Sequence, residues 1–374
     1  MKILFLRFPL KPAWGGAETQ ALALASGLRE RGHEVFLLSN DRRLVNAFAK
    51  SGLPAKKSWI GWEPTSKIAL LLFPLTSLIG FFVLSFWINK IEPAAVISTT
   101  LADKLLATPM AKMLGKKSLW IEHTRLGRWL YKNPFLFWYR LQSKDAKIVA
   151  PSYFLRNQLI QAGVPVDNIT VIYPGISLRH SDPPVAEKNL KRSFANARDD
   201  DKARKFVIGY LGRLTKEKGV DVLLKTIATI DNPAVIAGAG PEEQALKKLA
   251  EKLDLDDRVK FLGEISNKRD FFSQINCLVV PSVEAESFGL VIIEAMTAGV
   301  PVIASRIGAT GEIIEHKKTG LLFEPGNVEE LAKKIKFLRD NPTARTEVVK
   351  LAKTAVIQRF SAEKMILGFL NLVQ

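Results

Sequence analysis

Two glutamates, Glu286 and Glu294, stand eight positions apart, directly after an apolar run in the sequence. We expect a strand to end before them and a helix to start near Phe288 and stop at Gly299, since Pro301 follows. A helix start presents unpaired backbone N–H groups and a positive dipole end, which bind anions and above all phosphates. The segment therefore predicts a phosphate-binding helix start with a carboxylate on each side.

The separation of the two glutamates argues against a hydrolase pair. Eight residues along a helix span about 12 Å, whereas two carboxylates that flank one glycosidic bond lie about 5 to 9 Å apart. The spacing suits a longer ligand, with hydroxyls at each end for the carboxylates and phosphates in the middle for the helix start. A sugar–diphosphate–ribose chain has that layout.

Two cations follow the first apolar run of the second half of the chain. Arg213 comes directly after Gly212, and Lys218 stands five positions later, before Gly219. Open α/β sheets bind ligands at the carboxyl ends of their strands. Cations at that place would neutralise a leaving diphosphate, whose charge grows as its bond breaks. The alternative is a pair of solvated surface charges.

Glycines and a histidine occupy three further strand exits or helix starts. Gly15-Gly16 opens a helix expected over 17–31, and Gly238 begins a turn after an apolar run. Glycine lets a backbone come close to a phosphate at such a place. His123 also follows an apolar run. A lone histidine is usually structural, but its position favours a role at the ligand-binding edge of a sheet.

The whole chain alternates short apolar runs with helical patterns, which predicts parallel sheets built from strand–helix–strand units. In the first half we expect helices over 17–31 and 102–113 and strands over 3–6, 35–38, 95–98, 118–121 and 147–149. In the second half we expect strands over 206–211, 235–237, 259–262, 278–280 and 302–304, an edge strand over 320–323, and helices from Val328 to the end. Residues 180–205 are polar and are expected to connect two domains.

The composition fits two ordinary domains in a cytosolic protein. The chain has 374 residues, 47% of them hydrophobic, which is enough for two cores. Its one cysteine, Cys277, lies in an apolar run and is expected inside a strand. A single cysteine excludes a disulfide framework and a cysteine-rich metal site, and it favours a cytosolic or cytosol-facing protein. The N-terminal apolar run soon meets Arg7, Pro9 and Lys11, which suits a buried strand better than a secretory signal.

The positive charge of the chain is unevenly placed. Residues 1–180 hold 24 Lys and Arg against 10 Asp and Glu, so that +14 of the net +17 lies in the first half. Such a half predicts a polyanionic partner, either nucleic acid or anionic lipid headgroups. The basic residues are not interleaved with an aromatic platform and form no known nucleic-acid-binding module. We therefore expect no nucleic acid partner. A basic nucleic-acid-binding protein is kept only as an alternative hypothesis for the function.

The stretch Ile68–Ile88 is the most hydrophobic in the chain and has the length of a membrane span. Three interpretations are open. The first is a helix buried against the sheet or packed at a domain surface. The second is a helix that lies in a membrane interface, and the third is a true span, which would cut the sheet of the first domain in two.

In order along the chain, these motifs resemble the retaining glycosyltransferases of family four. The resemblance rests on the Glu286-x7-Glu294 spacing with Ser-Phe-Gly, the Gly212-Arg213 and Lys218-Gly219 loop, the Gly-x-Gly-Pro turn at Gly238, and the Gly15-Gly16-x-Glu18 loop. It implies an α/β protein of the GT-B fold, in which two doubly wound Rossmann-like domains face each other across a cleft and a C-terminal helix crosses back to the first domain. We expect an acceptor-binding domain over 1–170 with 360–374 and a nucleotide-sugar-binding domain over 171–359.

The resemblance also implies the roles of the site residues. Glu286 would position the hydroxyls of the donor sugar, Glu294 the ribose hydroxyls, and His123 would hydrogen-bond the sugar. The expected catalytic residues are Glu286, His123, Arg213 and Lys218, and the expected donor-binding residues are Gly15, Gly16, Arg213, Lys218, Gly238, Glu286, Ser287, Phe288, Gly289, Leu290 and Glu294. Glu18 is open between a donor contact and a first-turn helix carboxylate. Pro174 stands where the family more often has Asn, which puts a ligand contact there in doubt.

The implied activity is transfer of a hexose-type sugar from a nucleoside diphosphate to an acceptor hydroxyl with retention, in lipopolysaccharide, envelope polysaccharide or glycolipid synthesis. The donor is a co-substrate, and neither a cofactor nor a metal is required, although a divalent ion could bridge the diphosphate. The alternative is a sugar-nucleotide epimerase of the same fold. We expect the protein in the cytoplasm, with the basic first domain and Ile68–Ile88 docking on the inner face of the plasma membrane.

Overall fold

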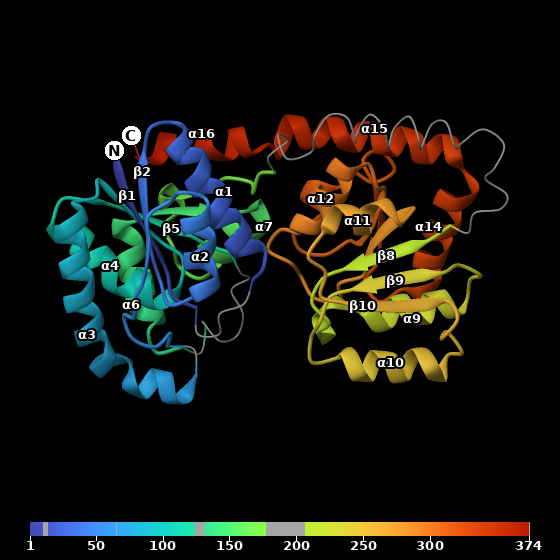
Figure 1. Ribbon diagram of the computed structural model, residues 1–374, viewed down its shortest axis with the longest axis horizontal. Helices are drawn as coiled ribbons and strands as arrows, with labels where there is room; N and C mark the ends of the chain where they lie inside the picture. Colours follow the sequence, from blue (N-terminus) through green and yellow to red (C-terminus); the bar gives the residue numbers. More distant parts are fainter. Residues whose placement is uncertain (10–13, 65, 124–130, 132, 177–205, 374) are drawn as a thin grey trace. The chain divides into compact units, whose positions relative to one another are not determined.

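The computed structural model describes residues 1–9, 14–64, 66–123, 131, 133–176 and 206–373 (Figure 1). The expected connection over 180–205 lies outside the described residues. The chain forms two compact units, the first Met1–Gly175 with Ala362–Gln374 and the second Ile176–Ser361. The boundary expected at residue 170 lies within a strand, Ile169–Val171, so the structural division falls a few residues later.

The first unit is built on a parallel sheet of seven strands in the order β3-β2-β1-β4-β5-β6-β7. Each strand that we expected is present, and the structure adds two three-residue edge strands, β3 and β7. The strands are β1 Lys2–Arg7, β2 Glu34–Ser39, β3 Ala55–Lys57, β4 Ala95–Ser98, β5 Lys117–Ile121, β6 Lys147–Ala150 and β7 Ile169–Val171.

Helices cover both faces of this sheet (Figure 1). Leu24 of α1, Phe48 of α2 and Phe369 of α16 share one core, so the C-terminal helix packs on the first unit. Leu84 of α3 and Met110 of α4 belong to the core on the other face. The helices are α1 Gly16–Glu30, α2 Arg42–Lys50, α3 Lys67–Ile91, α4 Leu101–Met113, α6 Leu136–Gln142, α7 Tyr153–Gln161 and α16 Ala362–Val373.

The second unit has a parallel sheet of six strands in the order β10-β9-β8-β11-β12-β13. Its strands are β8 Ile208–Leu211, β9 Ala234–Ala237, β10 Val259–Gly263, β11 Cys277–Val280, β12 Val302–Ser305 and β13 Leu321–Phe323. Its helices are α9 Val220–Ala228, α10 Glu243–Lys252, α11 Lys268–Ser273, α12 Leu290–Ala298, α13 Thr310–Ile313, α14 Val328–Asp340 and α15 Pro342–Arg359. Two doubly wound Rossmann-like units are thus confirmed.

Each sheet has one point where the strand order reverses. The reversal lies between β1 and β4 in the first unit and between β8 and β11 in the second. Where the crossover connections leave two adjacent strands toward opposite faces of an open α/β sheet, ligands bind at the carboxyl ends of those strands. These two edges are therefore where each unit is prepared for a ligand.

Helix α3 contains the stretch 68–88 in one continuous helix. Ala69, Phe73, Leu84 and Ile88 on one side are buried. The first of the three interpretations, a helix packed against the sheet, therefore explains the buried side of α3. Among the described residues, α3 is the helix that is long and apolar enough to cross a membrane by length and composition alone. Its other side is also apolar and is exposed to solvent.

Candidate active site

Lys218 and Glu286 meet at the strand reversal of the second unit. Because β8 pairs directly with β11, the loops that leave their carboxyl ends are neighbours. Lys218 Nζ lies 2.9 Å from Glu286 Oε2, and the Ser282 hydroxyl donates to Glu286 Oε1. The backbone N–H of Val283 donates to the carbonyl of Glu217 at 3.0 Å, which joins the two loops. A cation and a carboxylate, each about four-fifths buried, thus share one edge.

Two glycines allow the close approach of these loops. Gly219 has φ +64°, and a Cβ there would lie 2.1 Å from the Pro281 carbonyl oxygen. A Cβ on Gly308 would lie 2.5 Å from the Glu286 carbonyl oxygen, which accepts from the N–H of Ala309 at 3.1 Å. The loop after β12 therefore supports the backbone of Glu286. Neither Ser282 nor Gly308 stands in a recognisable motif, so the sequence alone does not reveal their roles.

Helix α12 begins at Leu290, two residues later than expected, and ends before Gly299 as expected. Gly289 has φ +122°, outside the helical region, so the helix cannot include it. Glu286 therefore lies in the preceding loop, and the figure of about 12 Å for eight helical residues does not measure the separation of the two glutamates.

Phe288 was expected among the donor-binding residues, but its side chain belongs to the packing of the second unit. It is buried, and its ring centroid lies 5.7 Å from that of Phe360. Ser287 and Leu290 beside it are half-buried. The Phe288 side chain is therefore not accessible to a ligand, whereas the neighbouring backbone lies at the helix start.

Glu294 is held by a lysine that the sequence analysis missed. Lys268 Nζ donates to both carboxylate oxygens of Glu294, at 2.6 and 2.9 Å. The Glu294 side chain is 18% exposed and that of Lys268 50% exposed. A pair with one solvated member can open when a ligand arrives, because water compensates the displaced cation. No motif marks Lys268, so only the packing of α11 beside α12 reveals it.

Arg213 and Gly238 lie in the loops after β8 and β9. The Arg213 side chain is 74% exposed, and its guanidinium lies 3.7 Å from Glu217, so it is open to solvent and is paired with a carboxylate other than Glu286. Gly238 has φ +134°, and a Cβ there would lie 1.8 Å from the Gly212 carbonyl oxygen. The structure therefore requires glycine at 238 for the approach of two loops, which is independent of any ligand.

In the first unit, Gly15 and Gly16 are exposed at the start of α1. Glu18, in the first turn of that helix, is buried and accepts from Arg7 Nε at 2.9 Å. Arg7 ends β1 and also donates to the Thr99 hydroxyl at 3.4 Å. Of the two roles left open for Glu18, this geometry favours the structural one, because the carboxylate already neutralises a buried arginine.

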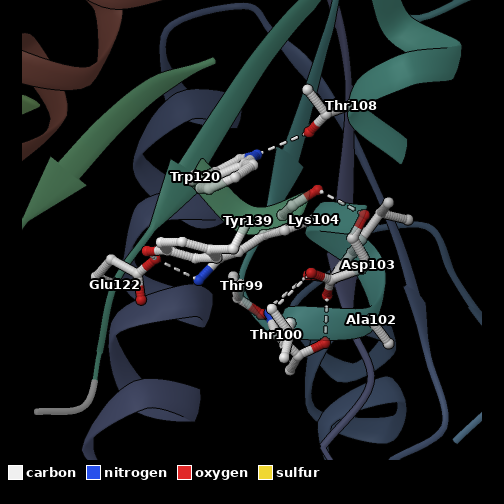
Figure 2. A network of polar contacts seen from close by, with 12 residues as sticks. Thr99, Thr100, Ala102, Asp103, Lys104, Thr108, Trp120, Glu122 and Tyr139 are labelled. Atoms are coloured by element: carbon white, nitrogen blue, oxygen red, sulfur yellow. Dashed lines mark hydrogen bonds and ion pairs between the residues drawn. The ribbon is translucent and has the colours of Figure 1, made fainter. Parts of the chain in front are cut away.

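A second buried pair lies beside His123. Lys104 Nζ donates to Glu122 Oε1 at 2.6 Å, and the Tyr139 hydroxyl donates to the same oxygen at 2.7 Å. Figure 2 shows Lys104 of α4, Glu122 directly after β5 and Tyr139 of α6 next to Trp120, whose indole N–H donates to Thr108 at 2.8 Å. Both charges are almost fully buried, with 4% and 6% of the side chains exposed. The network fixes the end of β5 and hence the residue that follows it.

His123 lies at that strand exit, where it borders a pocket with Gln20 of α1, Pro174 and Met365 of α16. Its Nε2 is buried. Burial lowers the pKa of His123 well below its usual 6.5, and the Arg7 and Lys104 cations lower it further. The imidazole is therefore neutral at pH 7, with one N–H to donate and one nitrogen to accept.

Pro174 borders the same pocket, and a hydrogen-bonded amide fixes the chain next to it. Gln20 Nε2 donates to the Gly175 carbonyl at 3.1 Å, and the Gly175 N–H donates back to Gln20 Oε1 at 3.2 Å. Among the described residues, no three His, Cys, Asp or Glu side chains gather as a metal site would require. The expectation that no metal is needed stays a prediction.

Comparison with known proteins defines the class. Residues 14–180 match the family model described as Glycosyltransferase Family 4, and residues 193–355 match the model described as Glycosyl transferases group 1. The two matches together take in most of the chain. The chain therefore belongs to the glycosyltransferases of GT-B type, as the two sheets and the order of motifs had indicated.

Individual relatives match only part of the chain, at moderate sequence identity. The chain is 31% identical over 228 residues to an uncharacterized glycosyltransferase of Methanocaldococcus jannaschii, an alignment that covers 58% of this chain and 57% of the relative. It is 31% identical over 191 residues to the lipopolysaccharide core biosynthesis glycosyltransferase LpsD of Rhizobium meliloti, covering 51% and 53%. The chain thus spans about half the length of these curated relatives.

Solved structures share the fold along the full length. The structure of HepE from Anabaena in complex with UDP superposes with a TM-score of 0.82 at 23% identity and covers 99% of both chains. The apo form of the lipopolysaccharide outer core galactosyltransferase WaaB superposes with a TM-score of 0.74 at 20% identity, covering 100% and 99%.

Proposed function

We propose that the protein is a retaining glycosyltransferase that moves a hexose-type sugar from a nucleoside diphosphate to an acceptor hydroxyl. The observation that carries the proposal is the meeting of Lys218 and Glu286 at the β8/β11 reversal, with Glu294 on the helix that follows. HepE, which has the same fold, was solved with UDP and with UDP-glucose. A donor of that chemistry needs a cation for its phosphates and carboxylates for its hydroxyls.

The roles follow from the chemistry of each group. In the reaction, the bond between the anomeric carbon and the diphosphate oxygen breaks and a bond to the acceptor oxygen forms. Lys218 and Arg213 stabilise the charge that builds up on the leaving diphosphate. Glu286 positions the sugar hydroxyls and Glu294 holds the ribose hydroxyls. The acceptor proton passes to the leaving diphosphate, because no side chain of the site is assigned as a base.

His123 donates a hydrogen bond to the sugar in this proposal. A neutral imidazole suits that task, because it offers an N–H without placing a second cation beside the anomeric carbon as positive charge develops there. The lowered pKa of His123 keeps the ring in that form. The pairing of Lys104 with Glu122 supports it, because the buried carboxylate is already neutralised and does not stabilise an imidazolium.

We infer that the acceptor is a lipid-linked or envelope glycan at the cytoplasmic membrane face. The relatives LpsD and LpsB of Rhizobium meliloti are named for lipopolysaccharide core biosynthesis. The +14 charge of residues 1–180 and the apolar outer side of α3 support a membrane partner for the first unit. The protein would then act as a peripheral enzyme in the cytoplasm.

A donor screen tests the proposal. Nucleoside diphosphate sugars that differ in base and sugar are compared by the rise in Tm that each produces. A ligand at 100 times its Kd should stabilise the folded protein by about 2.7 kcal/mol. We expect one donor to raise the Tm more than the others, and we expect the Lys218→Ala variant to show no such rise. Lys225→Ala is the matched control, since its ion pair with Asp221 at 2.8 Å is exposed. The absence of a response to every donor would contradict the proposal.

Product analysis separates the proposal from the epimerase alternative. With donor alone, a transferase releases sugar only slowly by hydrolysis, whereas an epimerase converts the donor into its epimer without an acceptor. The accumulation of an epimeric donor would assign the site to the alternative.

A further inference from the structure

Helix α3 carries a second apolar side opposite the one that it buries in the first unit. Six large residues form it, spaced three or four positions apart, so that they line one face of a helix. We call them the outer stripe: Ile68, Leu71, Leu75, Leu78, Phe82 and Phe86. Their exposed fractions range from 58% to 79%. Figure 1 shows α3 at the surface of the first unit, next to α4.

Burial in the protein does not explain the outer stripe. A helix that covers a sheet in water needs one apolar face, and its other face is normally polar. Here the inner side already packs tightly, since a Cβ on Gly80 would lie 2.1 Å from the Ile60 carbonyl oxygen. A contiguous exposed apolar surface of this length marks an interaction site.

The charges around α3 identify the partner. Lys67 begins the helix and Lys90 stands in its last turn, over the ring of Trp87 at 5.2 Å. Lys56 and Lys57 of β3 are exposed on the chain that leads to α3, and Trp59 between them and the helix is 38% exposed. An apolar helix face flanked by lysine and tryptophan is typical of a helix in the headgroup region of an anionic bilayer.

We propose that α3 lies in the plane of an anionic lipid bilayer, with the outer stripe among the acyl chains and the inner side still in the core of the first unit. This inference rests on the membrane partner of the proposed function and names the surface that makes the contact. A transmembrane orientation conflicts with the fold, because Leu84 and Ile88 are fully buried in the same core as β1 and β4.

Depth measurements on the full chain separate the two orientations. Leu71→Cys and Phe86→Cys each receive a fluorescent label, which is selective because the native Cys277 is buried and burial raises the pKa of its thiol to about 12. The two positions are fifteen residues apart, or about 22 Å along a helix. On anionic vesicles we expect both labels to report the same shallow depth by lipid-borne quenchers. Depths that differ by about 20 Å would overturn the in-plane arrangement.

Affinity measurements test which side chains make the contact. Leu71→Gln with Phe82→Gln should lower partitioning into phosphatidylglycerol vesicles by about 100-fold, because two large apolar groups no longer insert. Ile357→Gln with Phe337→Gln, on the second unit, removes an aliphatic and an aromatic side chain that are 55% and 42% exposed. This matched control should leave partitioning unchanged, and an equal loss in both variants would overturn the assignment.

Two further measurements test the role of the flanking lysines and the possibility that a second copy of the chain covers the outer stripe. Lys67→Gln and Lys90→Gln should each weaken binding to anionic vesicles about five-fold and leave neutral vesicles unaffected. If a second copy of the chain covered the outer stripe, labels at 71 and 86 would become shielded with protein concentration in the absence of lipid, which would overturn the proposal. Vesicle binding without sugar transfer would leave this inference standing and remove the proposed function instead.

Discussion

The carboxyl edges of the two sheets present their charges differently. In the first unit, Arg7 pairs with Glu18 and Lys104 with Glu122, and the side chains of both pairs are no more than 10% exposed. In the second unit, the Lys218–Glu286 pair is 21% and 17% exposed, and the lysine that holds Glu294 is half exposed. At the same edge of the same kind of sheet, the charged pairs are therefore buried in one unit and partly accessible in the other.

The difference separates charges that maintain a fold from charges that can meet a ligand. A buried pair cannot exchange its partner, because a charge left alone in a low-dielectric interior is costly. A partly exposed pair can, because water and ligand compensate the displaced group. We therefore expect substitutions in the first unit to cost stability and those in the second unit to cost binding and catalysis.

The largest expected effect is on the stability of the first unit. Lys104→Met should lower the free energy of unfolding by about 3–5 kcal/mol, since it leaves Glu122 buried without its cation. Chemical denaturation measures it. Adding Glu122→Gln should recover most of the loss, because the amide can still accept from Tyr139 without a charge.

Lys112 is the matched control on the same helix. Its pair with Asp145 has a comparable N–O distance of 2.8 Å, but the side chains are 65% and 35% exposed. An exposed pair contributes about 0–1 kcal/mol, so Lys112→Met should cost little. A loss equal to that of Lys104→Met would show that burial is not what distinguishes the two pairs.

The next largest effect is on transfer. Lys218→Ala should lower kcat/KM by about 100- to 1000-fold, the range expected when a group that stabilises developing charge is removed. Its free energy of unfolding should fall much less than that of Lys104→Met. The exposed Lys225→Ala should change neither. A variant that unfolds but retains its rate per folded molecule would place Lys218 with the structural charges and contradict the comparison.

Nucleotide affinity distinguishes the two glutamates of the second unit. Glu294→Ala should weaken binding of the nucleoside diphosphate about ten-fold or more, as for hydrogen bonds to a charged group. Glu286→Ala should weaken it less, because Glu286 is assigned to the sugar. Titration calorimetry measures both, with Glu243→Ala as the control from an exposed pair. The reverse order would exchange the two roles.

Sequence patterns predicted the elements of this fold because buried parallel strands are continuous apolar runs. The run 118–121 identified β5, and its end placed His123 at the ligand-binding edge. The edge strands β3 and β7 have three residues each, too few to show a period. The start of α12 was misplaced because the positive φ of Gly289 is a property of the backbone that residue type alone does not reveal.

Contacts between distant elements could not be predicted in the same way. Lys104 and Glu122 come from α4 and β5, and their pairing depends on which helix covers which strand end. Lys268 lies twenty-six positions before Glu294, on a six-residue helix without a motif. Phe288 stands in a motif that suggests a ligand, yet in the folded chain its ring packs against Phe360.

The remaining effect concerns the pH dependence of the buried charges in the first unit. Asp103, one residue before Lys104, is buried and accepts from the Thr100 N–H at 2.8 Å. Burial, and after it the nearby Glu63, raise the pKa of Asp103 to about 8 against the opposing effect of Lys104. The folded protein therefore keeps a proton that the unfolded chain releases near pH 4, so this group's stabilising contribution is lost as the pH rises from about 4 to about 8.

Asp103→Asn removes this titration and keeps an oxygen for the Thr100 N–H. The free energy of unfolding of the variant, relative to the natural chain, should therefore rise with pH across that window, by up to about 1.4 kcal/mol per pH unit. Denaturation at pH 5, 6.5 and 8 measures the change. Parallel curves would mean that Asp103 is already ionised in the folded state. Lys104 would then be shared between two buried carboxylates, Asp103 and Glu122.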